Sequence, residues 1–368
     1  MRLWVGLEET FSVGENFLAS SIHVMELPRK VVVGVDILES VGEICRRMSF
    51  PKKILAVTGP KTYEVAGGKV IDSLRDSGFE VEKEVVGEVS ENLITKLEKK
   101  VLDFGFSVVF GVGGGRIIDL AKYVSAKTKT LFVSVPTSAS HDGISSPYAS
   151  LKSFGSPISV RAQAPSAIIA DVQVITDSPF RLTASGCGDI IAKFTATRDW
   201  LLAHNLKNEY YGDYAANLAL MSAKLVAKNV GLIREDSVEG VRIVVEALIS
   251  CGVAMSIAGS SRPCSGSEHL FSHALDMIAP NRALHGERCG IGTIMMAYLH
   301  RLNWRKIKGV LKKIGAPTTA EELNVASDQI VEALTIAHKI RPERYTILGE
   351  KGLTREAAKK LAKVTGVI

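Results

Sequence analysis

The stretch SVVFGVGGGRIIDLAKY, residues 107–123, constrains the fold of this 368-residue chain more than any other segment. The uninterrupted apolar run over residues 107–112 is typical of a strand that helices bury on both faces of a parallel sheet. Three glycines follow at once, and residues 117–127 have helical spacing. Glycines allow close backbone approach, and a helix N-terminus offers free N–H groups to a phosphate. The stretch therefore predicts an inner strand that ends in a phosphate-binding turn, with a purely structural tight turn as the alternative.

Strand-like and helix-like segments alternate through the first half of the chain. Further strands are expected at residues 30–34, 53–58, 80–86, 130–135 and 167–171, with helical spacing between them. Such alternation is typical of a parallel sheet with right-handed crossovers. The sequence thus predicts an α/β Rossmann-like nucleotide-binding domain over residues 1–177 and an all-helical domain over residues 178–368. A ligand cleft is expected between the two.

Composition and charge exclude several classes of protein. A mean hydropathy of +0.17 excludes wholesale disorder. No stretch reaches the ~18 uncharged apolar residues of a membrane helix. Glu8 and Glu9 stand where a signal peptide needs an apolar run. We therefore expect a cytoplasmic protein without a transmembrane segment.

The net charge of +6 comes without a long basic block, so nucleic acid is not an expected partner. The five cysteines are scattered and form no CxxC pair. They argue against a disulfide framework and against a cysteine zinc site, and we expect them to be reduced and mostly in the core.

A second polar turn, PTSASHDGISSP at residues 136–147, follows the next predicted strand. Ligands of open α/β sheets bind beyond the carboxyl ends of the strands, where both turns are expected to lie. Thr137, Ser138 and Ser140 are candidates for hydrogen bonds to a cofactor. Asp142 is a candidate for orienting a substrate hydroxyl. An ordinary Ser/Thr/Asp turn is the alternative.

Three histidines occur close together in the predicted helical domain. His269 and His273 are spaced i,i+4 on one helix face, and His285 opens a new helix beyond a turn. Two imidazoles and one carboxylate make an open divalent-metal site with a position left for substrate. Asp189, in a predicted loop-to-helix stretch over residues 186–193, is the candidate carboxylate. Packed or surface histidines are the alternative.

The combination of these motifs resembles the iron-containing alcohol dehydrogenase and dehydroquinate synthase superfamily over almost the whole chain. The resemblance rests on GVGGGRIIDLAKY, PTSASHDGISSP, GCGDIIAK, SRPCSGSEHLFSHALD and ALHGERCGIGT. Within the superfamily, SRPCSGSEH is similar to the glycerol-phosphate branch. This likeness implies a dehydroquinate synthase-like fold. It also implies a reversible, metal-assisted reduction of dihydroxyacetone phosphate to sn-glycerol 1-phosphate with NAD(P)H, the first step towards the glycerophosphate backbone of archaeal membrane lipids.

The resemblance also implies roles for individual residues. It implies one Zn²⁺ per subunit, held by Asp189, His269 and His285. Asp142, Asp189 and His273 are the implied substrate contacts, and Asp142, His273 and Lys193 the expected catalytic residues. The implied cofactor contacts are Gly113, Gly114, Gly115, Arg116, Ile117, Ile118, Asp119, Thr137, Ser138, Ala139, Ser140 and Ser146. Lys193 and Arg262 are candidates for the substrate phosphate.

Several alternatives stay open at this point. A zinc polyol dehydrogenase acting on unphosphorylated glycerol shares the Asp and two His. A dehydroquinate synthase-like lyase is similar in its two histidines but is expected to carry a Glu at the first ligand position, where this chain has Asp189. A non-catalytic nucleotide- and metal-binding protein with the same fold is a further alternative. The Asp/His/His set also fits iron or nickel. Nothing separates NADH from NADPH, although Lys61 is a candidate for a 2′-phosphate. We expect a homo-oligomer.

Overall fold

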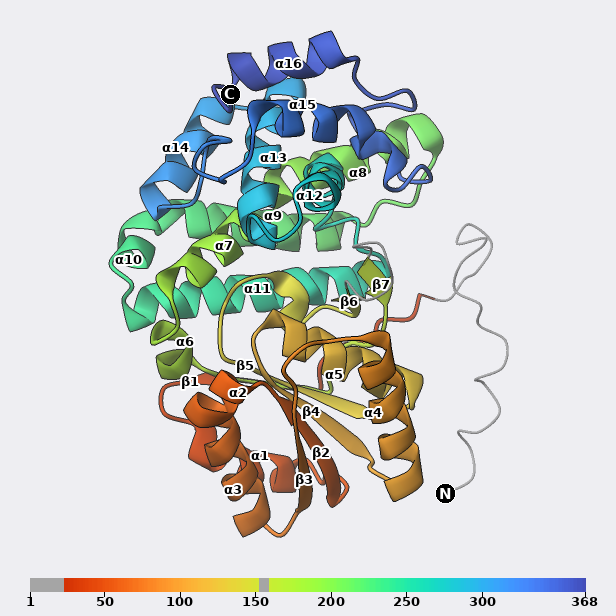
Figure 1. Ribbon diagram of the computed structural model, residues 1–368, viewed down its shortest axis with the longest axis vertical. Helices are drawn as coiled ribbons and strands as arrows, with labels where there is room; N and C mark the ends of the chain where they lie inside the picture. Colours follow the sequence, from red (N-terminus) through yellow and green to blue (C-terminus); the bar gives the residue numbers. More distant parts are fainter. Residues whose placement is uncertain (1–22, 152–158) are drawn as a thin grey trace.

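The computed structural model describes residues 23–151 and 159–368, as an α/β part and a helical part (Figure 1). The expectation about a signal peptide concerns residues outside this described range. All six strands of the main sheet are parallel, in the order β1-β8-β5-β4-β2-β3. Their bounds are β1 Lys30–Gly34, β2 Lys53–Thr58, β3 Glu80–Val85, β4 Val108–Gly113, β5 Leu131–Pro136 and β8 Ala167–Asp171.

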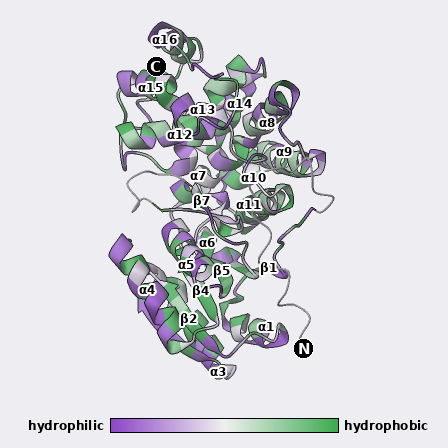
Figure 2. Cartoon of the chain, turned by 90° about the vertical axis from the view of Figure 1, so that its right-hand side faces the viewer, coloured by the Kyte–Doolittle hydropathy of each residue, from purple (hydrophilic) through white to green (hydrophobic). Residues whose placement is uncertain are grey.

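Helices cover both faces of this sheet. They are α1 Val41–Arg47 and α3 Gly68–Asp76 on one face, and α4 Glu91–Phe104 and α5 Gly115–Lys127 on the other. Along β2, Ile54 and Ala56 pack against the first pair, whereas Leu55 and Val57 pack against the second. Strand β4 and residues 54–57 of β2 are therefore apolar, and α4 presents its hydrophilic residues to solvent (Figure 2). The predicted doubly covered parallel sheet is confirmed.

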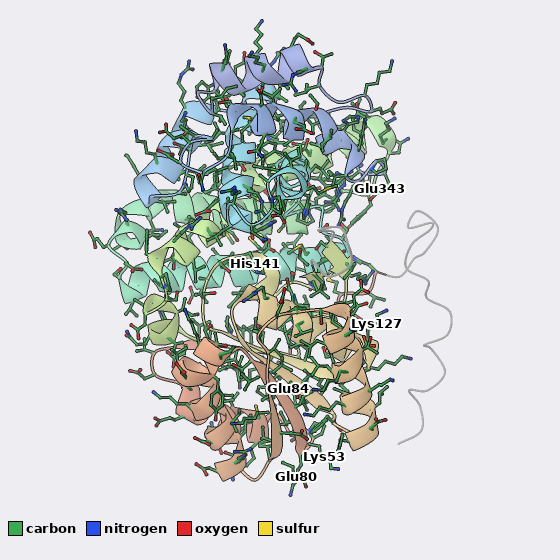
Figure 3. The ribbon with its side chains drawn as sticks, viewed as in Figure 1. Lys53, Glu80, Glu84, Lys127, His141 and Glu343 are labelled. Carbon is green, nitrogen blue, oxygen red and sulfur yellow. The ribbon has the colours of Figure 1, made fainter. Side chains whose placement is uncertain are left out.

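The strand order reverses between β2 and β4. From β2 the chain continues to β3 at the outer edge, whereas β4, β5 and β8 follow on the other side. Ligands of open α/β sheets bind at such a reversal, outside the carboxyl ends of the strands. In Figure 3, His141 lies at this end, beside the helical part, while Lys53 and Glu80 lie at the opposite end of the sheet.

After β8 the described chain contains helices and no strand, as the sequence predicts. These helices are α6 Val172–Thr176, α7 Phe180–Ile191, α8 Lys193–Lys207, α9 Asp213–Lys228, α10 Val230–Arg234, α11 Val238–Ala258, α12 Ser267–Ile278, α13 His285–Leu299, α14 Trp304–Ile314, α15 Ser327–Ile336 and α16 Arg355–Val364. Among the described residues, α11 alone is long and apolar enough to cross a membrane, but 72% of its most apolar window is buried inside the protein. It is the core helix of this part.

Two segments differ from the sequence prediction. Residues 186–193 are not a loop-to-helix stretch: residues 186–191 are the last part of α7, and α8 begins at Lys193. The glycines there serve close packing. A Cβ on Gly186 would lie 2.0 Å from the Ala139 oxygen, and one on Gly188 would lie 2.3 Å from the Gly286 oxygen. The short hairpin of β6 Tyr148–Ser150 and β7 Ser159–Arg161 was not predicted, because three-residue strands carry no periodic signal.

Candidate active site and metal centre

A cavity of about 890 Å³ lies at the carboxyl edge of the sheet, between the sheet and the helical part. The turns that follow β2, β4 and β5 line one end of it, with Lys61, Gly115 and Ser138 among their residues. His269, His273 and His285 of the helical part line the other end. We call these the cofactor end and the metal end.

The glycine turn forms the wall of the cofactor end. Gly114 has an extended backbone, and α5 begins directly after it at the cavity wall. The first N–H groups of α5 have no partner within the helix. A Cβ on Gly115 would lie 1.9 Å from Nε2 of His141, so any larger residue here would have to displace the His141 ring. Free N–H groups and the positive end of the helix dipole favour an anion at this position.

The structure separates the implied cofactor contacts into two groups. The described residues that line the cavity include Gly114, Gly115, Arg116, Ile117, Asp119, Ser138, Ser140 and Ser146. That lining does not include Gly113, Ile118, Thr137 or Ala139. Ile118 and Ala139 are fully buried in hydrophobic clusters, and Thr137 donates its backbone N–H to the Gly113 oxygen.

A buried ion pair fastens the second polar turn to α5. Lys122 Nζ lies 3.2 Å from Asp119 Oδ1, and it donates to the carbonyl oxygens of Gly143 and Tyr148, each at 2.6 Å. The other carboxylate oxygen of Asp119 accepts from the backbone N–H of Ser150 at 3.0 Å. Burial lowers the pKa of Lys122. Both residues are buried, and together they hold the turn at the cavity.

The three residues with the predicted metal-ligand pattern meet at the metal end. Asp189 comes from α7, His269 from α12 and His285 from α13, and together with Cys289 their donor atoms lie within 4.8 Å of one another. His269 Nε2 is 3.4 Å from Asp189 Oδ1, and the rings of His269 and His285 are 5.1 Å apart. The close crossing of α7 and α13 at Gly188 and Gly286 brings the donors together.

The electrostatics of this cluster suit a divalent cation. Burial raises the pKa of Asp189, but Lys193, His269 and His285 outweigh it and lower that pKa well below its ordinary value. Burial lowers the pKa of His285, which leaves its imidazole neutral. Burial also lowers the pKa of His269, but Cys289, Asp189 and Glu268 raise it overall. The negative surroundings that attract a proton to His269 also attract a metal ion.

A second carboxylate orients the first imidazole. Glu268 is completely buried, and its Oε1 accepts a hydrogen bond from His269 Nδ1 at 2.8 Å. Its other oxygen accepts from Thr195 Oγ1 at 2.6 Å. Such a pair fixes the tautomer of a metal-binding histidine and points the remaining nitrogen at the metal. One carboxylate and two imidazoles, one of them oriented in this way, fit zinc, iron or a similar ion.

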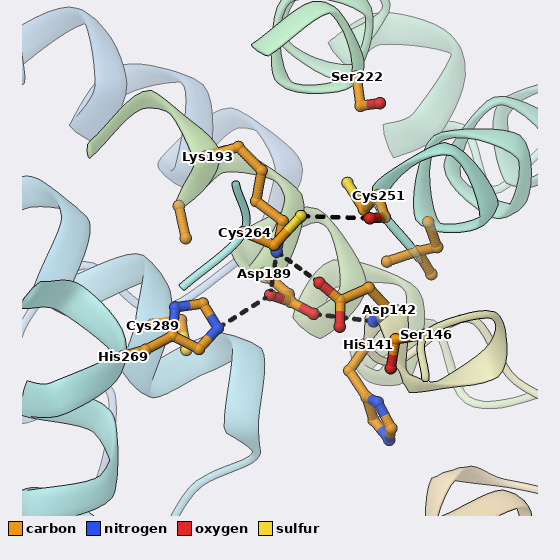
Figure 4. Close-up of polar contacts among 12 residues, drawn as sticks. His141, Asp142, Ser146, Asp189, Lys193, Ser222, Cys251, Cys264, His269 and Cys289 are labelled. Carbon is orange, nitrogen blue, oxygen red and sulfur yellow. Dashed lines mark hydrogen bonds and ion pairs between the residues drawn. The ribbon is translucent and has the colours of Figure 1, made fainter. Parts of the chain in front are cut away.

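Lys193 forms ion pairs with two acidic residues, Asp142 and Asp189 (Figure 4). Its ammonium lies 2.7 Å from a carboxylate oxygen of Asp142 and 2.7 Å from one of Asp189. Asp142 also donates its backbone N–H to Asp189 Oδ2 at 2.9 Å. The fully buried Lys193 therefore links the second polar turn of the α/β part to the metal end.

Neither predicted phosphate ligand lies in the cavity lining. The charge of Lys193 is compensated by the two carboxylates. The Arg262 guanidinium pairs with Glu209 and donates to the Tyr345 oxygen at 2.9 Å. Both side chains form internal contacts outside the cavity lining.

Cys289 is a member of the donor cluster that the sequence interpretation missed. It follows His285 by one helical turn, and its Sγ lies 3.5 Å from His285 Nε2. A search for CxxC pairs passes over it, whereas its i,i+4 spacing from a candidate histidine ligand is the signal that would have found it. Its sulfur is a further donor that a metal at this site can reach.

His273 lines the cavity beside the cluster. Its ring lies 6.0 Å from that of His285. Burial, followed by the charges of His269, Arg341 and Arg288, lowers the pKa of His273 to about 3. The imidazole is therefore neutral near pH 7, where it can donate one hydrogen bond and accept another.

Comparison with known proteins first defines the class. The model of the iron-containing alcohol dehydrogenase family matches residues 32–179. The fold is similar to that of a glycerol dehydrogenase from Schizosaccharomyces pombe, with a TM-score of 0.80, 23% identity and coverage of 94% of this chain and 91% of the other. A butanol dehydrogenase from Thermotoga maritima gives a TM-score of 0.72, 18% identity and coverage of 94% and 100%. The chain has the iron-containing alcohol dehydrogenase fold.

Full-length relatives then define the family. The chain is 53% identical to the glycerol-1-phosphate dehydrogenase [NAD(P)+] of Thermococcus sibiricus, covering 94% of this chain and 99% of the relative. It is 54% identical to that of Pyrococcus furiosus, covering 94% and 100%. It is 52% identical to that of Methanothermobacter thermautotrophicus, covering 94% and 99%. The chain belongs to the glycerol-1-phosphate dehydrogenase family.

Proposed function

We propose that this protein catalyses the reversible reduction of dihydroxyacetone phosphate to sn-glycerol 1-phosphate with NADH or NADPH. The observation that carries the proposal is the identity of more than half of the aligned residues to glycerol-1-phosphate dehydrogenases over nearly their whole length. The product would supply the glycerophosphate backbone of archaeal membrane lipids.

Asp189, His269 and His285 would hold the metal, because their donor atoms converge in a buried cluster at the cavity wall. When bound, the metal acts as a Lewis acid on the ketone oxygen, and the nicotinamide supplies the hydride. Glu268 keeps His269 oriented. Lys193 keeps Asp189 ionised and holds it beside Asp142.

At the cofactor end, the glycine turn and the start of α5 would bind the pyrophosphate through backbone N–H groups. Ser138, Ser140 and Ser146 line the cavity nearby and offer hydroxyl groups. At the metal end, the neutral imidazole of His273 and the carboxylate of Asp142, both in the cavity lining, would hydrogen-bond the substrate hydroxyl. These contacts position the ketone for attack on one face.

The test is the oxidation of NADH or NADPH by the purified, zinc-loaded protein. Dihydroxyacetone phosphate and unphosphorylated dihydroxyacetone are compared, and the chirality of the product is determined. Rapid oxidation with the phosphate ester alone, giving sn-glycerol 1-phosphate, is the expected result. Equal rates with both ketones would move the assignment to a polyol dehydrogenase. No oxidation with either would reject the assignment as an oxidoreductase.

Three further expectations stay predictions. We place the domain boundary between residues 177 and 178, which lie between α6 and α7. We expect a cytoplasmic enzyme that acts on a small-molecule substrate without nucleic acid. We also expect a homo-oligomer, which size-exclusion chromatography with light scattering would test.

A further inference from the structure

Arg341, which lines the cavity, and its neighbour Arg344 form no ion pair with a carboxylate among the described residues. Arg341 donates from Nη2 to the Ser159 oxygen at 2.8 Å. Arg344 donates to the Ser265 oxygen at 2.6 Å and to Ser261 Oγ at 2.8 Å. All of these acceptors are neutral, and no carboxylate within the described ranges 23–151 and 159–368 forms an ion pair with either guanidinium.

The other cavity-lining arginines are either paired or solvated. Arg181 forms a two-bond pair with Glu287 at 2.6 and 2.9 Å, and Arg288 lies 3.0 Å from Asp276. Arg116 and Arg282 are exposed to solvent, where a cation needs no partner. Arg341 is partly buried, and a charge removed from water is stable only with compensation.

The two guanidinium groups lie close enough for the charge of Arg341 to act on Arg344. Burial, followed by the charges of Arg341 and Arg262, lowers the pKa of Arg344 to about 9. Burial also lowers the pKa of Arg341 and outweighs the charge of Glu343, which raises it without forming an ion pair. Since Arg262 is neutralised by Glu209, the excess positive charge belongs to Arg341 and Arg344. An anion beside them would relieve the repulsion.

The cavity wall at this point carries hydrogen-bond donors as well as charge. Arg341, Tyr148, Ser261 and Ser265 all line the cavity. Ser261 Oγ accepts from Arg344, so its own hydrogen is available to an acceptor in the cavity. The charges of Arg341 and Arg344 act on Tyr148, whose pKa burial nevertheless raises. This is the donor set of a phosphate subsite.

The subsite is close to the metal end. His273 is affected by the charges of both Arg341 and Arg344, and its ring lies 6.0 Å from that of His285. One face of the cavity therefore runs from the arginines, past His273, to the metal donors. A short carbon chain with a phosphate at one end and a ketone in the middle matches this order of groups.

We propose that Arg341 is the main ligand of the substrate phosphate, with Arg344 supporting its charge and Ser261, Ser265 and Tyr148 adding hydrogen bonds. This inference rests on the proposed function and deepens it. It assigns the preference for a phosphorylated ketone to the segment after α15, in place of Lys193 and Arg262. The planar guanidinium of Arg341 can bind two phosphate oxygens at once.

The test compares the variants R341Q and R341K with the wild-type protein, all loaded with zinc. For R341Q, the kcat/KM for dihydroxyacetone phosphate should fall roughly 10- to 100-fold, the loss of a charged hydrogen-bond pair. The kcat/KM for unphosphorylated dihydroxyacetone should not change. R341K keeps the positive charge, so its kcat/KM for dihydroxyacetone phosphate should fall less than that of R341Q. Inorganic phosphate, used as a competitive inhibitor, should bind R341Q more weakly by a similar factor.

The matched control is R282Q, which removes an exposed arginine of the same cavity and should leave the ratio of the two substrates unchanged. If R341Q and R341K keep the wild-type ratio of kcat/KM for dihydroxyacetone phosphate to kcat/KM for dihydroxyacetone, the phosphate subsite is rejected and the proposed function stands. A rise confined to the KM for NADPH would assign the arginines to the cofactor 2′-phosphate and overturn it as well. Equal wild-type rates with both ketones would instead reject the proposed function.

Discussion

The two ends of the cavity are built in different ways. The cofactor end is formed by backbone: one glycine turn between β4 and α5, with small hydroxyl residues after β5. The metal end is formed by side chains from α7, α12 and α13, which are far apart in the sequence. A turn is specified by its own residues, whereas a cluster of side chains depends on how helices pack. The metal end should therefore be the more sensitive of the two to single substitutions.

The largest expected effect is the loss of a metal ligand. The variant H269A removes one imidazole that would hold the metal. The protein should therefore lose its metal and at least about a thousandfold in kcat/KM, since Lewis-acid assistance provides several kcal/mol. Metal content by mass spectrometry and NAD(P)H oxidation measure this. H204A, at an exposed histidine on α8, is the control. Full metal content in H269A would contradict the ligand assignment.

The next effect concerns the connection between the two ends. K193M leaves the carboxylates of Asp142 and Asp189 without their buried counter-ion, which should cost about 3–5 kcal/mol in the free energy of unfolding. Chemical denaturation of the metal-free protein measures the change. K207M, which removes an exposed ion pair with Glu350, should unfold like the wild type. Equal stability of K193M and wild type would show that the buried network does not depend on this lysine.

A smaller effect is expected at the helix crossing that brings the metal donors together. In G188A the new methyl group would lie 2.3 Å from the Gly286 oxygen, so α7 and α13 must separate, at a cost of about 1–3 kcal/mol. G309A, on α14, meets no atom within 4 Å and should gain about 0.5–1 kcal/mol from the better helix former. Thermal unfolding of the two variants should thus shift in opposite directions. A shift in the same direction would refute the packing argument.

The smallest effect belongs to the cofactor end. In G115A the methyl group meets the His141 ring, a side chain that can move, so binding of NAD(P)H should weaken about tenfold while metal content stays normal. Cofactor fluorescence titration measures the affinity. G231A, where a methyl group meets open space, serves as the control. Loss of metal in G115A would show that the two ends are not independent.

The features predicted correctly from the sequence are those that neighbouring residues determine, such as strand bounds and the start of a helix. The bounds of β1, β2 and β8 agree with the structure to the residue, because apolar runs between turn residues mark buried strands clearly. His285 opens α13 as expected. The glycines at 186 and 188 were misread as part of a loop, since a helix crossing and a loop use the same residue type.

What the sequence did not reveal depends on distant contacts. Cys289 becomes a donor only because α7 and α12 approach the start of α13. Lys193 is a counter-ion for Asp142, a residue of the other part of the molecule. Among the described residues, Arg341 and Arg344 donate to neutral oxygens, whereas Arg181 and Arg288 form ion pairs. Spacing along the chain records none of these relationships.

The most direct test of the account is a zinc titration of the metal-stripped protein, with reduction of dihydroxyacetone phosphate by NAD(P)H as the measure. We predict negligible activity without zinc and a linear rise to a plateau at one equivalent per chain, lost in H269A. Full activity of the stripped protein, or a plateau unaffected by H269A, would contradict the assignment of Asp189, His269 and His285 as the metal centre.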